Sequence, residues 1–320
     1  QVKIGLVLIP TLSYGFLLLR EPFPVTEGVQ AGVSLGEAFK AAFTTPLMLV
    51  MLIAMTMTAS VELGPNRWVP AVLEAGGMAG ILVLVWINGL MAVMRYRAGA
   101  VVHKLSPTGV LLGSAVLAGV GLLALSYVSS GIAVFGAATV FALGVCYFWP
   151  TMLGVVSERV PKSGALGLGL MGTVGMATVG LVAAPQMGRI ADEYAHDQIP
   201  AAEVTVVLER TAMVLGNSQD PDAQAAVSAA EGVVQEFEVS GLLPAPATAN
   251  ALRSIIASDA DADLIGQAQA ILGPADNYGG KISFRYMVPL CGILMLIFGA
   301  LYMRDRRTGG YRVESIEADG

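Results

Sequence analysis

A few polar and ionisable side chains lie inside long apolar stretches of this 320-residue chain. Burying an ionisable group among hydrocarbon costs free energy, so such a residue is by default a candidate for function. These side chains could form hydrogen bonds to a polar solute, stack on it, or carry a proton or ion. The candidates for a solute or ion pathway are Glu62, Asn66, Arg67, Trp68, Trp86, Asn88, Tyr147 and Trp149.

Glu62 has the clearest chemistry of this set. Its carboxyl group could carry a proton when neutral, and when ionised it needs Arg67 or a cationic ligand beside it. Asn66 and Trp68 follow about one helical turn later, where an amide and an indole could contact the same ligand. Structural roles compete with this interpretation: Glu62 and Arg67 could form an ion pair, Trp68 could anchor the membrane interface, and Asn88 could bind a neighbouring helix.

Tyr147 and Trp149 come directly before Pro150 in a second apolar stretch. Because proline has no N–H, a kink there frees a backbone carbonyl, which a membrane helix tolerates when a neighbour binds that carbonyl. The sequence therefore predicts a polar backbone group in the middle of a span, beside two aromatic side chains.

The sequence contains no catalytic or metal-binding pattern. There is no Ser-His-Asp, His-Glu-x-x-His or paired-cysteine arrangement, and the two histidines, His103 and His196, are far apart. Cys146 and Cys291 both lie in apolar runs, where a cysteine is usually a small buried hydrophobe. We therefore expect no enzyme activity, no metal ion and no cofactor.

The apolar stretches are membrane spans by composition and length. The chain is 55% hydrophobic and only 13% charged, whereas soluble domains carry about 25% charged residues. A helix of about 20 apolar residues crosses a hydrocarbon core of about 30 Å. The predicted spans are 3–19, 46–73, 77–97, 109–128, a pair within 131–190, and 284–303. The expected fold is thus an all-α membrane protein with seven transmembrane helices.

Many small residues lie in these spans, where they let helices approach closely. The run of glycines in the sixth span is Gly164, Gly169, Gly172, Gly175 and Gly180, and the shorter pairs are Gly76 with Gly80 and Gly109 with Gly113. Residues 167–172 match a G-x-G-x-x-G pattern, but no strand precedes them, which argues against a dinucleotide site.

Two segments differ from the spans. Residues 191–281 are rich in Asp and Glu and show helical periodicity in 201–215, 222–239 and 248–272, which predicts a small acidic helical insertion. In the linker, Ser34 and Glu37 have capping-box spacing, which predicts a short amphipathic helix, either on the membrane surface or as an ordinary linker helix. The domain boundaries are therefore span 1–19, linker 20–45, spans 46–190, insertion 191–281, last span 282–304 and tail 305–320.

Positive charges set the expected orientation, because cytoplasmic loops are enriched in Lys and Arg. If span 3–19 ends in the cytoplasm, the cytoplasmic segments hold most of the cations, and the insertion lies outside. Those cations are Arg20, Lys40, Arg95, Arg97, Lys104, Arg159, Lys162, Arg304, Arg306, Arg307 and Arg312. Arg95 and Arg97 are then interpreted as anchors of topology. The net charge is −6, and the sequence shows no basic face of the kind that nucleic-acid binding needs. The lipid bilayer is therefore the expected partner.

The order of spans resembles the major facilitator superfamily of secondary transporters, over about 1–190 and 282–312. Residues 148–165 (Phe-Trp-Pro-Thr-Met-Leu-Gly through Lys-Ser-Gly-Ala) and 62–68 are similar to a bacterial branch of this superfamily near its sugar porters. The family's loop signature G-x-x-x-D-R-x-G-R-K aligns with 99–108. Gly99 and Lys104 agree with it, while His103 stands in place of the acid and Ser106 in place of the second glycine.

This resemblance implies a secondary active transporter that works by alternating access in the cell inner membrane. The seven spans would match helices 6–12 of a twelve-helix bundle, and the remaining N-terminal half of the same transporter would be the partner. The cargo would be a small polar solute, sugar-like or another organic metabolite, with Glu62 as the proton- or ion-coupling carboxylate. The acidic insertion is not part of the family's pattern.

A second interpretation stays open beside the transporter. The chain could be a membrane-anchored receptor or scaffold whose acidic insertion binds a partner. A transporter needs polar groups at mid-bilayer, whereas a scaffold needs only the insertion. Glu62, Asn66 and Asn88 favour the transporter.

Overall fold

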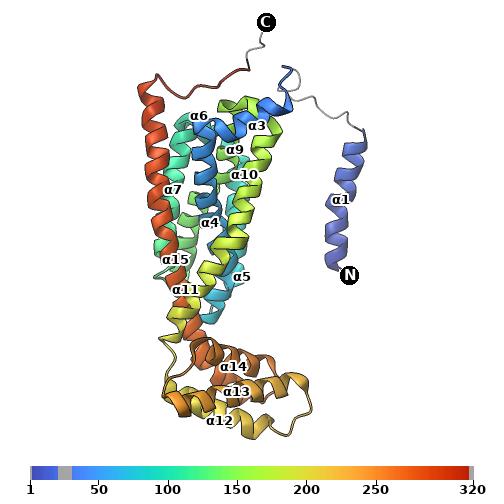
Figure 1. Ribbon diagram of the computed structural model, residues 1–320, viewed down its shortest axis with the longest axis vertical. Coiled ribbons are helices and arrows are strands. Elements are labelled where there is room, and N and C mark those ends of the chain that lie inside the picture. Colours follow the sequence, from blue (N-terminus) through green and yellow to red (C-terminus); the bar gives the residue numbers. More distant parts are fainter. Residues whose placement is uncertain (1, 21–30, 317–320) are drawn as a thin grey trace.

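The computed structural model describes residues 2–20 and 31–316; the expected linker residues 21–30 and tail residues 317–320 lie outside the described part. Every regular element of the described part is a helix (Figure 1). The helices are α1 (Val2–Arg20), α3 (Leu35–Thr44), α4 (Pro46–Ala75), α5 (Gly80–Tyr96), α6 (Ala98–Leu105), α7 (Pro107–Leu125), α8 (Ile132–Val145), α9 (Phe148–Arg159), η1 (Pro161–Ser163), α10 (Gly164–Thr178), η2 (Val179–Ala183), α11 (Ala184–His196), α12 (Ala201–Leu215), α13 (Pro221–Ser240), α14 (Ala245–Ala257) and α15 (Ala262–Arg307).

Within the described residues, five helices are long and apolar enough to cross a membrane, and six if the bent pair α5 and α6 counts as one span. The five are Pro46–Ala75, Pro107–Leu125, Ile132–Arg159, Pro161–His196 and Ala262–Arg307. They run roughly parallel to one another as a bundle in Figure 1. The first expected span, 3–19, corresponds to α1, which counts only as a shorter apolar helix over its part Val7–Leu19 and is drawn apart from the bundle (Figure 1).

The acidic region forms a compact group of helices at one end of the bundle (Figure 1). Helices α12, α13, α14 and the first part of α15 share a hydrophobic core of their own, which includes Val204, Leu208, Ala226, Leu252 and Leu264. We call this group the acidic helical domain. Its exposed faces carry the Asp and Glu residues, so burial of one apolar stripe per helix accounts for its folding.

The boundary that the sequence indicated at residue 281 is wrong as an element boundary. Helix α15 continues without a break from Ala262 to Arg307, through Pro274 and Pro289. The last helix of the acidic helical domain and the last membrane span are therefore one helix. Gly279 and Gly280 do not end it, because they lie where α15 packs against α11 and α4: a Cβ on Gly279 would meet the Ala191 carbonyl, and one on Gly280 would meet Val72.

Prolines break some helices and not others. The span over 131–160 divides into α8 and α9 at Cys146 and Tyr147, four and three residues before Pro150. The π-helical turn η2 precedes Pro185 and has the same cause, a missing N–H in the helical ladder. By contrast, α4 runs continuously through Pro65 and Pro70.

The predicted linker helix is present as α3. Its capping box is complete: the Ser34 side chain accepts from the Glu37 N–H, and the Ser34 N–H donates to Glu37 Oε2 at 2.7 Å. The bonds from the Ser34 backbone and hydroxyl lower the pKa of Glu37 below its usual value. Phe39 and Phe43 stack with ring centroids 6.1 Å apart on the exposed face of α3.

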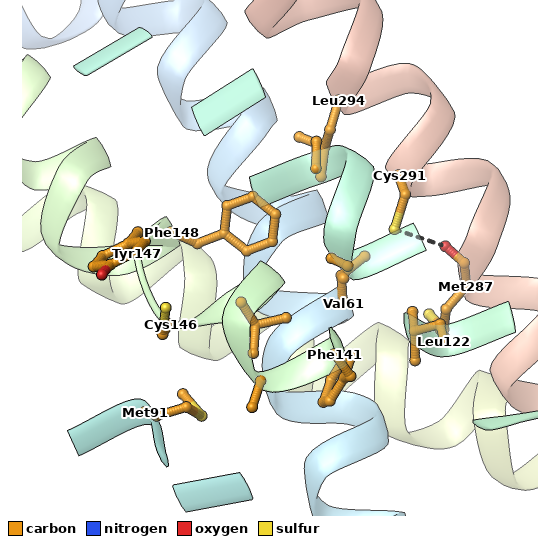
Figure 2. Close-up of a cluster of buried hydrophobic side chains, with 14 of the residues drawn as sticks. Val61, Met91, Leu122, Phe141, Cys146, Tyr147, Phe148, Met287, Cys291 and Leu294 are labelled. Carbon is orange, nitrogen blue, oxygen red and sulfur yellow. Dashed lines mark hydrogen bonds between the residues drawn. The ribbon is translucent and has the colours of Figure 1, made fainter. Parts of the chain in front are cut away.

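A sulfur- and aromatic-rich core fills the centre of the bundle (Figure 2). Phe141, Phe148 and Leu122 are fully buried there. Cys146 and Cys291 are free and buried, as the sequence indicated, and the Cys291 thiol lies 3.9 Å from the Met287 carbonyl (Figure 2). These side chains come from α7, α8, α9 and α15, so the core joins the last helix to helices from the middle of the chain.

Two of the close helix approaches are at glycines that the sequence analysis did not single out. A Cβ on Gly144 would overlap the Ala118 backbone, and one on Gly121 would overlap the Phe141 backbone, so α7 and α8 meet at these two points. Of the glycines in the sixth span, Gly175 packs against Trp149 and Ala59, whereas Gly169 has open space beside it.

Replacing Gly144 with alanine is expected to destabilise the bundle by about 1–3 kcal/mol, because the added methyl group forces α7 and α8 apart. Gly136→Ala is the matched control, since Gly136 lies in the same helix with open space beside it. The control should be neutral or slightly stabilising because alanine favours helix. Unfolding in mixed micelles measures both; equal free energies of unfolding for the two variants would contradict the close contact.

Candidate functional site

Glu62 lies in the middle of α4 and is held by Arg95 from α5. Glu62 is 3% exposed, and its Oε1 accepts from an Arg95 guanidinium nitrogen at 2.7 Å. Each residue is about 20 Å along its helix from the Ala75–Gly80 end, at a rise of 1.5 Å per residue. Glu62 therefore lies near the middle of α4, whereas Arg95 lies in the last turn of α5. The expected Glu62–Arg67 pair is wrong: Arg67 is exposed, and Arg95 holds the carboxylate.

A second polar contact joins the same two helices. Asn66, one turn after Glu62, donates from Nδ2 to Asn88 Oδ1 at 3.2 Å, and Asn88 Nδ2 donates to the Leu84 carbonyl. Asn88 and Arg95 are seven residues apart and so share one face of α5. The interface of α4 and α5 thus carries two successive polar contacts, one ionic and one between amides. Asn88 does bind a neighbouring helix, which was the structural alternative for this residue.

The carbonyl that Pro150 frees is also bound by Arg95. In an α-helix the N–H of residue 150 would donate to the carbonyl of residue 146, and proline has none. Arg95 Nε instead donates to the Cys146 carbonyl at 2.8 Å. One guanidinium therefore satisfies both the Glu62 carboxylate and the kink of the α8–α9 span, so it connects three helical segments.

Tyr147 and Trp149 both lie at this kink, between Cys146 and Pro150 in the chain. The Tyr147 hydroxyl donates to the Met94 carbonyl at 3.2 Å, next to Arg95. Figure 2 shows Tyr147 beside Cys146 and Phe148. The Trp149 ring packs against Gly175 on α10. Its Nε1 is buried and has no hydrogen-bond partner among the described residues.

The Glu62 cluster consists of Glu62, Asn66, Asn88, Arg95 and Tyr147 together with Trp149. Within the described part of the chain, three of its buried polar atoms have no partner: Glu62 Oε2, Asn66 Oδ1 and Trp149 Nε1. Buried polar groups are nearly always hydrogen-bonded, so unpaired ones in one place need an explanation. The two acceptors lie one turn apart on α4 and could accept from a hydroxyl-bearing solute, and Glu62 could exchange a proton. The Arg95 side chain is 40% exposed, so the cluster is open on one side.

Three of the predicted pathway residues lie away from this cluster. Trp86 turns to the other side of α5, where its Nε1 donates to Thr139 Oγ1 at 2.9 Å and its ring lies edge-on to Phe135. Trp68 packs beside Gly188 on α11. Arg67 is exposed on the surface of α4. The structure therefore brings together five of the eight predicted residues and separates these three.

The segment that aligns with the family's loop signature is helical. Gly99, His103 and Lys104 lie on α6, which is bent by 66° from α5. His103 and Lys104 line a cavity of about 640 Å³ that also contacts Glu158 and Tyr311. In the described part of the chain, no group of three or more His, Cys, Asp or Glu side chains could hold a metal ion.

A buried ionic network closes the same end of the bundle. Asp305 of α15 accepts from Arg159 of α9 and from the Thr108 hydroxyl, each at 2.7 Å. The Arg159 guanidinium lies 4.1 Å from the centroid of the Tyr311 ring, and the Tyr311 hydroxyl donates to Glu158 at 2.6 Å. Burial, together with the bond to Glu158, raises the pKa of Tyr311. The chain after α15 is thereby fixed against α9.

Comparison with protein-family models, with curated proteins and with solved structures found no match for this chain.

Proposed function

We propose that this chain mediates secondary active transport of a small polar solute, sugar-like or another organic metabolite, across the cell inner membrane. Transport would occur by alternating access, coupled to a proton or ion at Glu62. The observation that carries this proposal is the Glu62 cluster: unpaired acceptors and a donor, buried beside an ion pair inside an apolar bundle. Such groups are costly in a membrane and are found where a polar cargo or ion binds.

The direct test is uptake in proteoliposomes by this chain together with the N-terminal half expected as its partner, with and without a proton or sodium gradient. A panel of sugars, nucleosides and organic acids covers the proposed cargo class. Gradient-dependent uptake of one of them that Asn66→Ala with Asn88→Ala weakens supports the site. If the chain together with its N-terminal half moves none of the panel, the transporter proposal fails.

A second candidate function rests on the separate core of the acidic helical domain. A domain that folds around its own core could bind a partner while the spans serve as its anchor. Deleting the residues between His196 and Asn277 distinguishes the two functions. Uptake that survives the deletion excludes the receptor or scaffold interpretation as the main function, whereas uptake lost with an intact bundle favours it.

Orientation is tested by labelling single cysteines, because Cys146 and Cys291 are both buried. Gln219→Cys, exposed between α12 and α13, is expected to react with a membrane-impermeant maleimide on intact spheroplasts. Lys162→Cys, exposed between α9 and α10, is the matched control and should react only after lysis. The reverse pattern would place the acidic helical domain in the cytoplasm.

A further inference from the structure

A cavity of about 570 Å³ lies where the bundle meets the acidic helical domain. It is bordered by the C-terminal end of α4, the turn between α7 and α8, and the middle of α15. Two cations of α15, Lys281 and Arg285, line it. Sequence analysis did not identify either residue as functional.

Neither cation has a carboxylate partner in the described part of the chain. Lys281 is 6% exposed, and its Nζ donates to the Ser129 hydroxyl at 2.7 Å. Arg285 donates to the Ser126 hydroxyl at 3.2 Å and to the Ser126 carbonyl at 3.1 Å, and its guanidinium lies 4.2 Å from the Tyr127 ring centroid. By contrast, Arg159, which is buried to a similar extent as Lys281, forms an ion pair with Asp305.

The spacing of Lys281 and Arg285 adds to the free-energy cost of burying them. Residues four apart lie on the same face of a helix, and like charges at that spacing repel each other. A buried charge without a counter-ion is strongly unfavourable unless something neutralises it. Hydroxyl and carbonyl oxygens satisfy the hydrogen-bonding geometry of Lys281 and Arg285, but they supply no negative charge.

The rest of the lining suits an oxyanion. It contains amides and hydroxyls, namely Gln198, Asn277, Tyr278 and Ser129, and no Asp or Glu. A guanidinium and an ammonium facing one cavity bind phosphate-type oxygens through charge-assisted hydrogen bonds. Acidic residues far outnumber basic ones in the neighbouring acidic helical domain, yet no carboxylate lines this cavity.

We propose that the Lys281–Arg285 cavity binds a phosphate-type oxyanion, supplied either by a phospholipid head group or by a soluble phosphate. This site is separate from the Glu62 cluster, so its test does not depend on transport. Its function would be to neutralise the two cations and to hold α4, the α7–α8 turn and α15 together.

The test uses the purified full chain in neutral detergent and measures its thermal midpoint. In the first arm inorganic phosphate is titrated against chloride at constant ionic strength. In the second arm native mass spectrometry compares binding of phosphatidylglycerol with that of phosphatidylcholine. The variants are Lys281→Gln and Arg285→Gln, each expected to weaken binding about tenfold through loss of a charge-assisted bond.

Three further variants keep the test interpretable. Lys281→Arg and Arg285→Lys retain the charge and should retain binding, even if the glutamine variants fold poorly. Arg304→Gln removes an exposed cation from the same helix and should change nothing. A phosphate-dependent rise in the midpoint that the glutamine variants reduce supports the site with a soluble source. Selective phosphatidylglycerol binding, reduced by the same variants, supports it with a lipid source. Absence of both effects, or equal binding in all variants, overturns the proposal.

Discussion

Replacing Glu62 with glutamine is expected to abolish concentrative uptake and to leave solute exchange intact. The amide oxygen can still accept the 2.7 Å bond from Arg95, so the contact between α4 and α5 is kept. The variant cannot ionise, however, and so cannot bind and release a coupling proton or ion. Accumulation should therefore fall to simple equilibration of the solute, while counterflow continues. The measurement compares uphill uptake and counterflow in the same proteoliposomes.

Glu74→Gln is the matched control for this prediction. Glu74 is an exposed glutamate of the same helix, twelve residues further along, and its replacement should change neither activity. If Glu62→Gln accumulates solute as well as the original chain, Glu62 is not the coupling carboxylate. If the variant loses exchange and thermal stability together, the Glu62–Arg95 pair is structural.

Replacing Asp305 with alanine is expected to destabilise the bundle by about 3–5 kcal/mol. Asp305 is 4% exposed and accepts from Arg159 and Thr108. Its removal leaves a buried guanidinium without a counter-ion, which is the costly way to break a buried pair. Loss of this network would also loosen the contact of Tyr311 with Arg159, so the chain after α15 would be released from α9. Unfolding in mixed micelles measures the stability, and trypsin cleavage near Arg312 measures release of the tail.

Asp263→Ala provides a comparison within the same helix. Asp263 pairs with Arg210 at 2.8 Å, but its side chain is 67% exposed, and exposed pairs contribute only about 0–1 kcal/mol. Equal losses in the free energy of unfolding for the two variants would show that the stabilisation by Asp305 does not depend on its burial. Replacing Arg159 and Asp305 together by Met and Leu should recover much of the stability, because no unpaired charge remains.

The sequence was sufficient to predict features that depend on local chemistry. Apolar length identified the five helices, or six with the bent pair, that could cross a membrane. Capping-box spacing identified the start of α3, and Pro150 identified the carbonyl that the kink frees. Each of these follows from residues within a few positions of one another. Helices α12 and α13 begin and end close to the expected ranges for the same reason, whereas the expected range 248–272 is divided between α14 and the start of α15.

Features that depend on how helices are placed against each other could not be predicted. Glu62 has two cations within reach of a sequence-based argument, and Arg67 is the nearer in sequence. The choice of Arg95 depends on the antiparallel register of α4 and α5, which places residues 33 positions apart at the same depth. Likewise, Gly279 and Gly280 usually indicate a break, and only their contacts with α11 and α4 explain why α15 continues.

The unbroken course of α15 has a mechanical consequence. A helix of 46 residues is about 70 Å long, and its two ends belong to different parts of the molecule. With a pivot near the middle of the membrane-spanning portion, a tilt of about 10° would swing Ala262 through about 8 Å. The acidic helical domain would be the far arm of a lever, so a small tilt of α15 within the bundle would displace the whole domain.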